Sequence, residues 1–326
     1  MGTQRLQKTR RSNLKAIACL VLTLSAVTSP AIADELLLIK DYSDSHERVE
    51  PDKLFLSAED DSLFDSLTLF MGVDGSKQPK DFGVNANLGL QAHINTGIQL
   101  DRESGLSLQA GLGVVGSQNA VQVLELVGEA TDRVQGFATI GLFQRSEEGF
   151  LWSLAHDFLI EESYDAFFLS QWRGRVGYQF DSCNEAGFQS QLRGLTDDGF
   201  FLTTPVSLRT IDQVSVYGRH TFETGTQFTI WMGLADSHGE DNAVTGPGTR
   251  KDLVPLLGAD FLAPLNDHLA LYGETNLIMP ADTGTVDAFL GFQWFPGGGA
   301  LKARRRTSDP VLSVASPTTM SVDLRQ

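Results

Sequence analysis

The chain has 326 residues, a formal net charge of −16, and 41 acidic against 25 basic residues. Such an excess of negative charge argues against nucleic acid and against anionic lipid head groups as partners. No apolar run is long enough for a membrane-spanning helix, which needs about 20 such residues. The composition therefore favours an exported or surface protein that is built from other elements than transmembrane helices.

The first 33 residues have the features of a cleavable signal peptide. A basic stretch without acidic residues precedes an apolar stretch from Ala16 to Val27, and Ala31-Ile32-Ala33 matches the small-x-small pattern of a cleavage site. Removal of five basic residues leaves 25 − 5 = 20 basic and 41 acidic residues, a charge of −21. Only Cys183 then remains, which excludes a disulfide framework. The sequence predicts export, with residues 1–33 removed.

Strand-like alternation begins after an acidic, irregular stretch at 34–63, which we interpret as a periplasmic N-terminal segment. The alternation is clearest at 82–100, where apolar residues such as Leu88 and Leu90 share one parity and polar residues such as Gln91 share the other. Period two is the mark of a strand with one apolar and one polar face. The run is longer than most strands of globular proteins.

About twelve segments show this pattern. They lie near 64–74, 82–101, 105–115, 133–144, 149–159, 166–180, 185–194, 212–222, 226–235, 252–263, 268–277 and 285–295. Short connections (102–104, 145–148, 181–184, 223–225, 264–267) alternate with longer ones (75–81, 116–132, 160–165, 195–211, 236–251, 278–284). Strict alternation of short and long connections is typical of up-and-down membrane barrels. We predict an all-β, up-and-down antiparallel transmembrane β-barrel of about 12 strands over 64–295, with ten or fourteen as the alternatives.

Alternation alone does not say which face meets lipid, since a soluble barrel or sandwich turns its apolar face inward. Two features favour the membrane arrangement. The polar face mixes charged residues with many Asn and Gln, as a hydrated lumen would. Aromatic residues also fall near strand ends, where interfacial girdles lie, namely Phe82, Phe180, Phe222, Trp294 and Phe295. A soluble secreted β-sandwich that binds a ligand is the alternative.

The polar parity gives the candidate site. The expected lumen-lining residues are Arg173, Arg175, Arg193, Arg219, Asp260, Glu274, Asp287, Gln91 and His93. Because isolated ions are costly in a narrow lumen, we expect the four arginines to pair with the three carboxylates of the later strands. Such pairs could restrict passage or serve as a structural network, and the 116–132 loop is a candidate to fold inside.

Residues 296–326 are unlike the barrel. Pro296-Gly297-Gly298-Gly299 ends the last strand, Arg304-Arg305-Arg306 follows, and the remainder is rich in Ser, Thr and Pro. This composition is typical of disorder, and we predict a disordered C-terminal tail on the periplasmic side. The aromatic Phe292-Gln293-Trp294-Phe295 therefore lies well before the end, whereas many barrel proteins end on such a strand.

At 173–187 the sequence reads Arg-Gly-Arg-Val-Gly-Tyr-Gln-Phe-Asp-Ser-Cys-Asn-Glu-Ala-Gly. Together with Phe82–Leu100 and Thr139-Ile140-Gly141-Leu142-Phe143, this stretch resembles a family of uncharacterised exported proteins from planctomycete bacteria, whose members look like outer-membrane β-barrels. The resemblance covers 64–295. It implies a barrel fold and an outer-membrane location, and it brings no catalytic residues.

Other motifs have simpler interpretations than a reaction site. Gly111-Leu-Gly113-Val-Val-Gly116 matches the dinucleotide-binding pattern, but no repeated βαβ units follow it. The histidines lack metal-ligand spacing. Cys183 lies in a tight turn and is a candidate reactive thiol. The acidic pairs Asp197-Asp198 and Glu240-Asp241 lie in long loops, where acids are usually solvated. No cofactor and no metal are expected.

The sequence thus favours a passive pore or an envelope structural protein in the cell outer membrane. Its partners would be the lipid bilayer and, for a pore, small ions or solutes. We expect no enzymatic activity. An outer-membrane enzyme that hydrolyses lipids or peptides is the alternative, since sites at a barrel rim are assembled in space and leave no motif.

Overall fold

The computed structural model describes residues 65–81, 86–119, 125, 128, 131–236, 253–279, 285–301 and 306–325. The expected signal peptide (1–33) and periplasmic segment (34–63) lie outside these residues, as do Phe82, Glu240 and Asp241. Within the described part of the chain, no helix combines the length and the apolarity that a membrane crossing requires.

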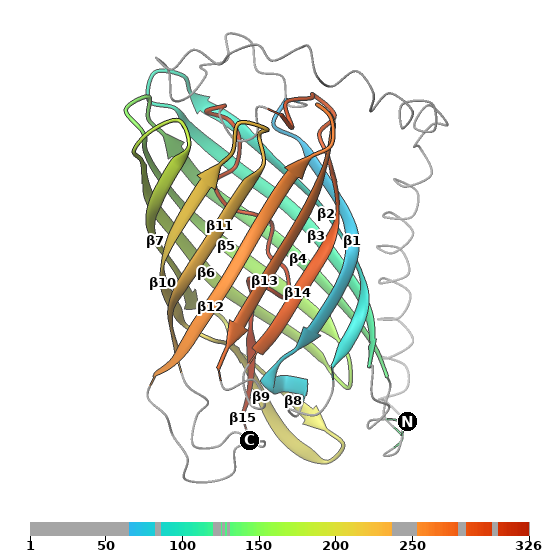
Figure 1. Ribbon diagram of the computed structural model, residues 1–326. Coiled ribbons are helices and arrows are strands. Elements are labelled where there is room, and N and C mark those ends of the chain that lie inside the picture. The colour runs from blue at the N-terminus through green and yellow to red at the C-terminus, as the bar shows by residue number, and fades with distance from the viewer. Residues whose placement is uncertain are drawn as a thin grey trace, which may run out of the picture. The chain divides into compact units, whose positions relative to one another are not determined.

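Twelve of the described strands pair into one closed antiparallel ring (Figure 1). They are β1 (Thr68–Lys77), β2 (Asn87–Asp101), β3 (Leu106–Asn119), β4 (Asp132–Arg145), β5 (Phe150–Glu162), β6 (Ala166–Gln179), β7 (Asn184–Arg193), β10 (Gln213–Thr221), β11 (Gln227–Asp236), β12 (Leu253–Pro264), β13 (Leu269–Ile278) and β14 (Thr285–Trp294). The last strand closes the ring against the first, with Leu69 opposite Trp294. This confirms the predicted all-β, up-and-down antiparallel barrel, and closure leaves no unpaired sheet edge in the wall.

The strands form because their side chains alternate between two environments. On the outer face lie large apolar side chains such as Leu90, which is 67% exposed, and Leu112, which is 61% exposed. On the inner face lie buried polar residues such as Gln91, Gln109 and Asp157. A soluble barrel has the reverse arrangement. The apolar face therefore looks outward, as in a transmembrane barrel.

Aromatic side chains mark the ends of several strands on the outer face. Phe180, Phe222 and Trp294 are exposed there, as the girdle interpretation predicts. Phe295 differs from that prediction, because it packs against the apolar cluster inside the barrel that contains Phe70.

The connections divide the barrel into a short-turn end and a long-loop end. Tight turns at 102–105, 146–149, 180–183, 222–226 and 265–268 lie at the short-turn end. The opposite end carries the longer connections, but the predicted strict alternation is wrong at 163–165. There Ser163 N donates to Asp165 O over 3.1 Å and closes a tight turn between β5 and β6.

A second, small sheet lies at the long-loop end. The expected loop 195–211 contains the hairpin of β8 (Asp197–Phe201) and β9 (Thr204–Thr210), and β9 also pairs with β15 (Val322–Arg325) near the end of the chain. A short 3-10 helix, η2 (Pro79–Asp81), lies in the β1–β2 connection and contacts β15.

Candidate functional site in the lumen

The C-terminal segment, defined as residues 306–325, runs through the inside of the barrel (Figure 1). At the short-turn end Arg306 Nη1 donates to the carbonyl oxygen of Asp65 over 2.8 Å. At the long-loop end the segment finishes as β15, with Val322 opposite Thr210 of β9. Between these points most of its side chains are buried. The lumen is therefore filled by the protein's own chain.

This arrangement differs from the expectation of a disordered tail at 296–326. A segment rich in Ser, Thr and Pro cannot build a core of its own, but here the barrel wall supplies one. Val311, for example, is buried against Phe143 and Leu151 of the wall. The segment also carries no charge from Val311 to Val322, which suits a buried path. The 116–132 loop, which was the expected occupant, lies mostly outside the described residues.

Two glycines of the wall make room for the segment. A Cβ added to Gly97 of β2 would overlap the carbonyl oxygen of Ser308. A Cβ added to Gly111 of β3 would lie 2.6 Å from Val314 Cγ2. Protein interiors are close-packed, so neither position can hold a larger residue unless the segment shifts. Close packing against the segment thus explains Gly111, the first glycine of the dinucleotide-like motif.

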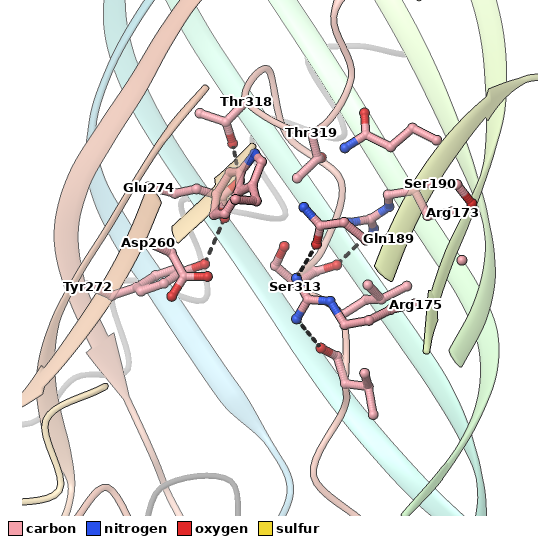
Figure 2. Close-up of a pocket in the computed structure, with 15 residues that line it drawn as sticks. Arg173, Arg175, Gln189, Ser190, Asp260, Tyr272, Glu274, Ser313, Thr318 and Thr319 are labelled. Atoms are coloured by element: carbon pink, nitrogen blue, oxygen red, sulfur yellow. Dashed lines mark hydrogen bonds between the residues drawn. The ribbon is translucent and has the colours of Figure 1, made fainter. Parts of the chain in front are cut away.

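Two arginines of β6 bind the backbone of the segment (Figure 2). Arg173 Nη2 donates to Ser313 O over 2.8 Å, and Arg175 Nη1 donates to Val311 O over 3.3 Å. An extended chain that is not part of a sheet leaves its carbonyl groups unpaired, and buried carbonyls need donors. The arginines that the sequence places in the lumen therefore serve the segment as well as the wall.

Amide side chains of the wall do the same. Gln109 Nε2 and Asn95 Nδ2 both donate to Leu312 O, over 2.7 and 3.2 Å. Further along, Gln171 Nε2 donates to Thr319 O over 2.8 Å. These three amides of the polar parity thus hold a polypeptide.

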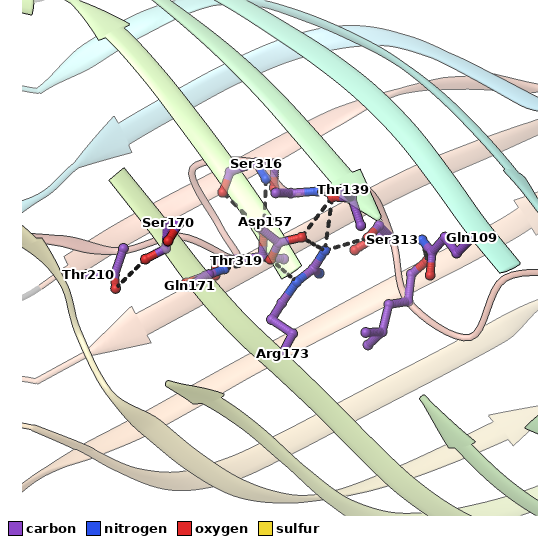
Figure 3. Close-up of polar contacts among 12 residues, drawn as sticks. Gln109, Thr139, Asp157, Ser170, Gln171, Arg173, Thr210, Ser313, Ser316 and Thr319 are labelled. Atoms are coloured by element: carbon purple, nitrogen blue, oxygen red, sulfur yellow. Dashed lines mark hydrogen bonds and ion pairs between the residues drawn. The ribbon is translucent and has the colours of Figure 1, made fainter. Parts of the chain in front are cut away.

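Asp157 is the centre of the polar network in Figure 3. It is fully buried and forms an ion pair with Arg173. Thr139 Oγ1 donates to Asp157 Oδ1 over 2.8 Å, Gln171 Nε2 donates to its Oδ2 over 3.0 Å, and Ala315 N donates to Thr139 Oγ1 over 2.9 Å. A desolvated carboxylate is tolerated only with such partners. The network joins three neighbouring strands to the segment.

The other two arginines of the middle of the barrel are also engaged. Arg175 lies over the ring of Tyr217, 4.7 Å from its centroid, and Nη2 donates to Gln189 Oε1 over 2.7 Å. Arg219 Nη1 lies 3.5 Å from Glu185 Oε2. These contacts tie both guanidinium groups to the wall, and Arg175 Nη1 also reaches Val311 O of the segment.

Arg193 belongs to a charge cluster at the long-loop end. Its Nη2 lies 2.6 Å from Asp212 Oδ2 and 3.5 Å from Asp236 Oδ2, and its side chain is 31% exposed. Arg209 of β9 joins Asp236 to Asp323 of the segment, with Nη2 3.2 and 3.5 Å from the two carboxylates. Burial lowers the pKa of Arg209, against the attraction of Asp323.

The expected carboxylates also contact neighbours other than arginine. Glu274 accepts hydrogen bonds from Thr318 Oγ1 over 2.7 Å and from Tyr272 OH over 2.9 Å. Asp287 Oδ2 accepts one from Gln78 Nε2 over 2.8 Å. Both carboxylates therefore help to fix the segment or the loop beside it.

The ion pairs thus differ from the expected pairing across the lumen. Within 4.0 Å, the arginines of the middle strands pair with Asp157, Glu185, Asp212 and Asp236. Adjacent antiparallel strands bring facing side chains to about 5 Å from one another, so neighbours meet first. The segment also stands between the opposite walls.

Gln91 and His93 are buried on the inner face of β2. The His93 ring stacks on Phe70, with centroids 4.7 Å apart and planes inclined by 15°. Gln91 Nε2 lies 3.4 Å from His93 Nδ1. Both residues are buried in the wall packing.

Sequence reasoning missed a buried charge cluster at the long-loop end. Lys80 of η2 is 1% exposed and pairs with Glu161 of β5, and Arg133 Nη1 lies 3.2 Å from Asp81 Oδ1. Burial raises the pKa of Asp81, against the attraction of Arg133 and Lys80. Gln78 N donates to Asp81 Oδ2 over 2.9 Å. The β1–β2 connection is irregular, so its sequence has no periodic pattern from which these contacts could be predicted.

Gln78 links this cluster to the segment. Its Nε2 donates to Pro317 O over 3.1 Å, and its Oε1 accepts from Val322 N over 3.2 Å. One side chain of the β1–β2 connection therefore contacts the segment at two points, Pro317 and Val322.

Apolar packing holds the far part of the segment. Met320, Val322 and Leu324 are fully or almost fully buried. They share one cluster with residues of the wall and of β9, namely Val115, Phe137, Leu159, Phe167, Leu169, Val206 and Leu208. The inner face is thus apolar where the segment is apolar.

Two small cavities lie beside the segment. A cavity of about 40 Å³ is lined by Asp260, Glu274 and Ser313, and one of about 50 Å³ by His93 and Asn95. One water needs roughly 10–15 Å³ by this measure, so each cavity fits a few waters. Among the described residues, no group of three His, Cys, Asp or Glu is placed to hold a metal ion.

The remaining motifs have structural roles. Cys183 lies in the β6–β7 turn, where its backbone N donates to Asp181 Oδ1 over 2.7 Å. Hydrogen bonds from the side chain of Asn184 and from the turn backbone lower the pKa of Asp181. Asp197 Oδ2 accepts from Phe168 N over 2.8 Å, so this loop acid fixes the start of the hairpin.

A closed ring of twelve strands, apolar outside and filled inside by its own chain, defines a β-barrel of the transmembrane type with an internal plug. Residues 66–322 match the model of a family of unknown function, DUF6666, and the chain belongs to this family. The match runs through the barrel to Val322, the first residue of β15, so the family's common region includes most of the segment. A search of curated protein sequences found no match.

Several solved structures are similar in fold. The NanC porin is 7% identical, with 70% of this chain and 98% of that chain covered and a TM-score of 0.40. The Salmonella typhi outer membrane phospholipase OMPLA, a dimer with bound calcium, is 7% identical, with 70% and 90% covered and a TM-score of 0.39. The β domain of the Bordetella autotransporter Brka is 12% identical, with 71% and 100% covered and a TM-score of 0.41.

Proposed function

We propose that the protein is an outer-membrane β-barrel pore that its own C-terminal segment closes at rest. One observation carries the proposal: residues 307–324 fill the lumen of a wall that pairs into a complete ring without them. Because the segment contributes no strand to the ring, its departure would break no wall hydrogen bond between strands. The polar inner face would then line a water-filled path.

The outer-membrane location is part of the same proposal. The apolar outer face and the expected signal peptide support an exported barrel in contact with lipid. In such barrels short turns face the periplasm and long loops face outward. We therefore place the short-turn end on the periplasmic side, with the segment running outward through the lumen.

The resting state would be closed to solutes. Cavities of about 40 and 50 Å³ admit water molecules but no hydrated ion with its shell. Barrels of eight strands are filled by side chains, and those of sixteen are open. A ring of twelve strands lies between them, so an emptied lumen would pass small ions or solutes.

An envelope structural protein is the second candidate. The burial of Met320, Val322 and Leu324 in one apolar cluster favours it, because such packing resembles a permanent core. The segment would then never leave. We propose no enzymatic role, and hydrolysis of phospholipid or peptide by the folded chain would contradict this.

Conductance in planar bilayers tests the pore. The parent is compared with the double variant Val322→Asp/Leu324→Asp, since a neutral polar group buried without a hydrogen bond costs roughly 2–7 kcal/mol and an ionised carboxylate costs more. Leu324→Met is the matched control, because it conserves volume and polarity. We expect closed parent and control channels and an open double variant. If the double variant folds, as shown by heat-modifiable migration on gels, and does not conduct, the pore is rejected in favour of the structural role.

A further inference from the structure

The barrel wall contacts the C-terminal segment largely through the segment's main chain. Donors from the wall reach the carbonyl oxygens of Asp309, Val311, Leu312, Ser313 and Thr319. Main-chain N–H groups of the segment also donate to the wall and its connections. Ala315 N donates to Thr139 Oγ1, and Val322 N donates to Gln78 Oε1. These bonds do not depend on which side chain the segment carries at each position.

Main-chain recognition is how proteins bind extended peptides. In strand addition, the sheet edge supplies hydrogen bonds for affinity, and pockets for alternate side chains supply specificity. Here the guanidinium and amide groups of the inner wall take the place of a sheet edge over the middle of the segment. At the end of the segment a true sheet edge is used, because β15 pairs with β9 as an added strand.

Pockets for side chains are also present. Val311 is buried with Phe143 and Leu151. Farther along, Val322 and Leu324, two residues apart on one face of β15, are buried in the cluster at the long-loop end. The positions between Val311 and Val322 are uncharged, and most are small. A charged residue there would be desolvated, at a cost that only a well-placed partner offsets.

We propose that the lumen is a binding channel for an extended polypeptide with a central uncharged stretch, with the C-terminal segment as its resident ligand. The same sequence supplied by a second copy of this chain can replace the resident. Recognition combines main-chain hydrogen bonds with apolar anchors at Val311, Val322 and Leu324. This inference rests on one part of the proposed function, namely that the resident can leave the lumen.

A reversible lock can be built into the protein. Leu208 of β9 and Leu324 of β15 are Cα partners. Facing residues of antiparallel strands have Cα atoms about 4.5–5.5 Å apart, which is within disulfide range. In a Cys183→Ser background, the pair Leu208→Cys and Leu324→Cys should form a bond that holds the resident when oxidised and releases it when reduced.

The experiment measures binding of a fluorescent synthetic peptide with the sequence of residues 306–326 to the full mature chain in detergent micelles. Anisotropy is recorded for the double variant Val322→Asp/Leu324→Asp, whose resident is weakened, and for the lock, oxidised and reduced. Two peptides serve as controls: a scrambled sequence, and one with the three anchors changed to Ser. We expect the native peptide to bind the double variant at least about tenfold more tightly than either control, a factor that one lost anchor is sufficient to produce.

The outcomes separate this inference from the pore. Binding to the double variant and the reduced lock, with none to the oxidised lock, supports the channel. Equal binding of scrambled peptide overturns it. A double variant that conducts but binds no peptide overturns the channel and leaves the pore. A double variant that binds the native peptide but never conducts rejects the pore and supports the peptide-binding lumen. If the double variant fails to fold, the reduced lock allows the same comparison of native and control peptides in a protein without a buried charge.

Discussion

The two halves of the C-terminal segment are held by different forces. Residues 307–313 are surrounded mainly by polar wall groups such as Gln109 and Arg173, which donate to their carbonyl oxygens, while Val311 packs on the apolar pair of Phe143 and Leu151. Residues 314–324 pack Met320 and Leu324 into an apolar cluster. A hydrogen bond adds little net stability but is costly to leave unmade, whereas apolar burial is the dominant favourable term. The polar half therefore sets the register of the segment. The apolar half supplies most of the free energy that keeps the segment in the lumen.

The largest expected effect is in the polar half. Arg173→Met leaves the carboxylate of Asp157 buried without its ion-pair partner and Ser313 O without its donor. Breaking a buried pair from one side costs about 3–5 kcal/mol. We expect the free energy of unfolding in urea to fall by that amount. The control is Arg193→Met at the partly exposed end, where a pair is worth about 1 kcal/mol or less. Equal losses would show that the Arg173 network is not the desolvated centre that its burial indicates.

The apolar half is tested by Leu324→Ala. Leu324 is fully buried, and a Leu→Ala change in a core costs about 2–5 kcal/mol. Because this side chain belongs to the segment and not to the ring, the loss should appear as faster proteolysis within 306–325 while the barrel keeps its heat-modifiable migration. Leu202→Ala at the exposed hairpin tip is the control, with an expected change within about 0.5 kcal/mol. Unfolding of the whole ring by Leu324→Ala would mean that wall and segment form one cooperative unit.

A smaller effect is expected from the hydrogen bonds of one amide. Gln109→Met removes a donor to Leu312 O, which keeps the bond from Asn95, and a donor to Asn95 Oδ1. The net loss should be about 0.5–1.5 kcal/mol for each bond. The control is Gln99→Met, since Gln99 donates to the hydroxyl of Thr307, at a less buried position. If Gln99→Met costs more than Gln109→Met, main-chain bonds do not set the register.

The wall could be predicted from the sequence because it meets two different environments. Alternation such as that of Val286, Asp287 and Ala288 repeats wherever one face meets lipid and the other faces inward. That local rule located all twelve strands of the ring and the orientation of their faces. It also placed Arg173, Arg175 and Arg219 on the inner face, although it could not give their partners.

The segment could not be predicted by the same rule, because protein surrounds it on all sides and no period arises. Its contacts join residues far apart in the sequence, such as Gln78 and Val322. The sequence did contain one signal. Gly97, Gly111 and Gly113 lie on the inner parity of β2 and β3, and a water-filled lumen does not require glycine at such positions. These glycines face Ser308, Val314 and Ala315. Glycine on the inner face of a barrel strand can thus indicate an occupant.

The smallest expected effects are slopes with pH, and they have opposite signs at the two ends of the barrel. Burial raises the pKa of Asp81 at the long-loop end above its usual 3.8, while turn hydrogen bonds lower that of Asp181 at the short-turn end. As pH rises above 3.8, the unfolded chain loses the Asp81 proton before the folded chain does, so ionisation of Asp81 reduces stability until the raised pKa is passed. The Asp181 contribution is present above 3.8 and is lost as pH falls through the lowered folded value.

Unfolding in urea between about pH 3 and pH 7 tests these signs in Asp81→Asn and Asp181→Asn. Relative to the parent, Asp81→Asn should gain stability as pH rises, and Asp181→Asn should lose it. The slope is the informative quantity, because Asp81→Asn also weakens the pair with Arg133 and so shifts the whole curve. A falling slope for Asp81→Asn would mean that Arg133 and Lys80 outweigh burial. The charge cluster beside Gln78 would then hold the segment most firmly when Asp81 is ionised, and acid would loosen the plug at its outer end.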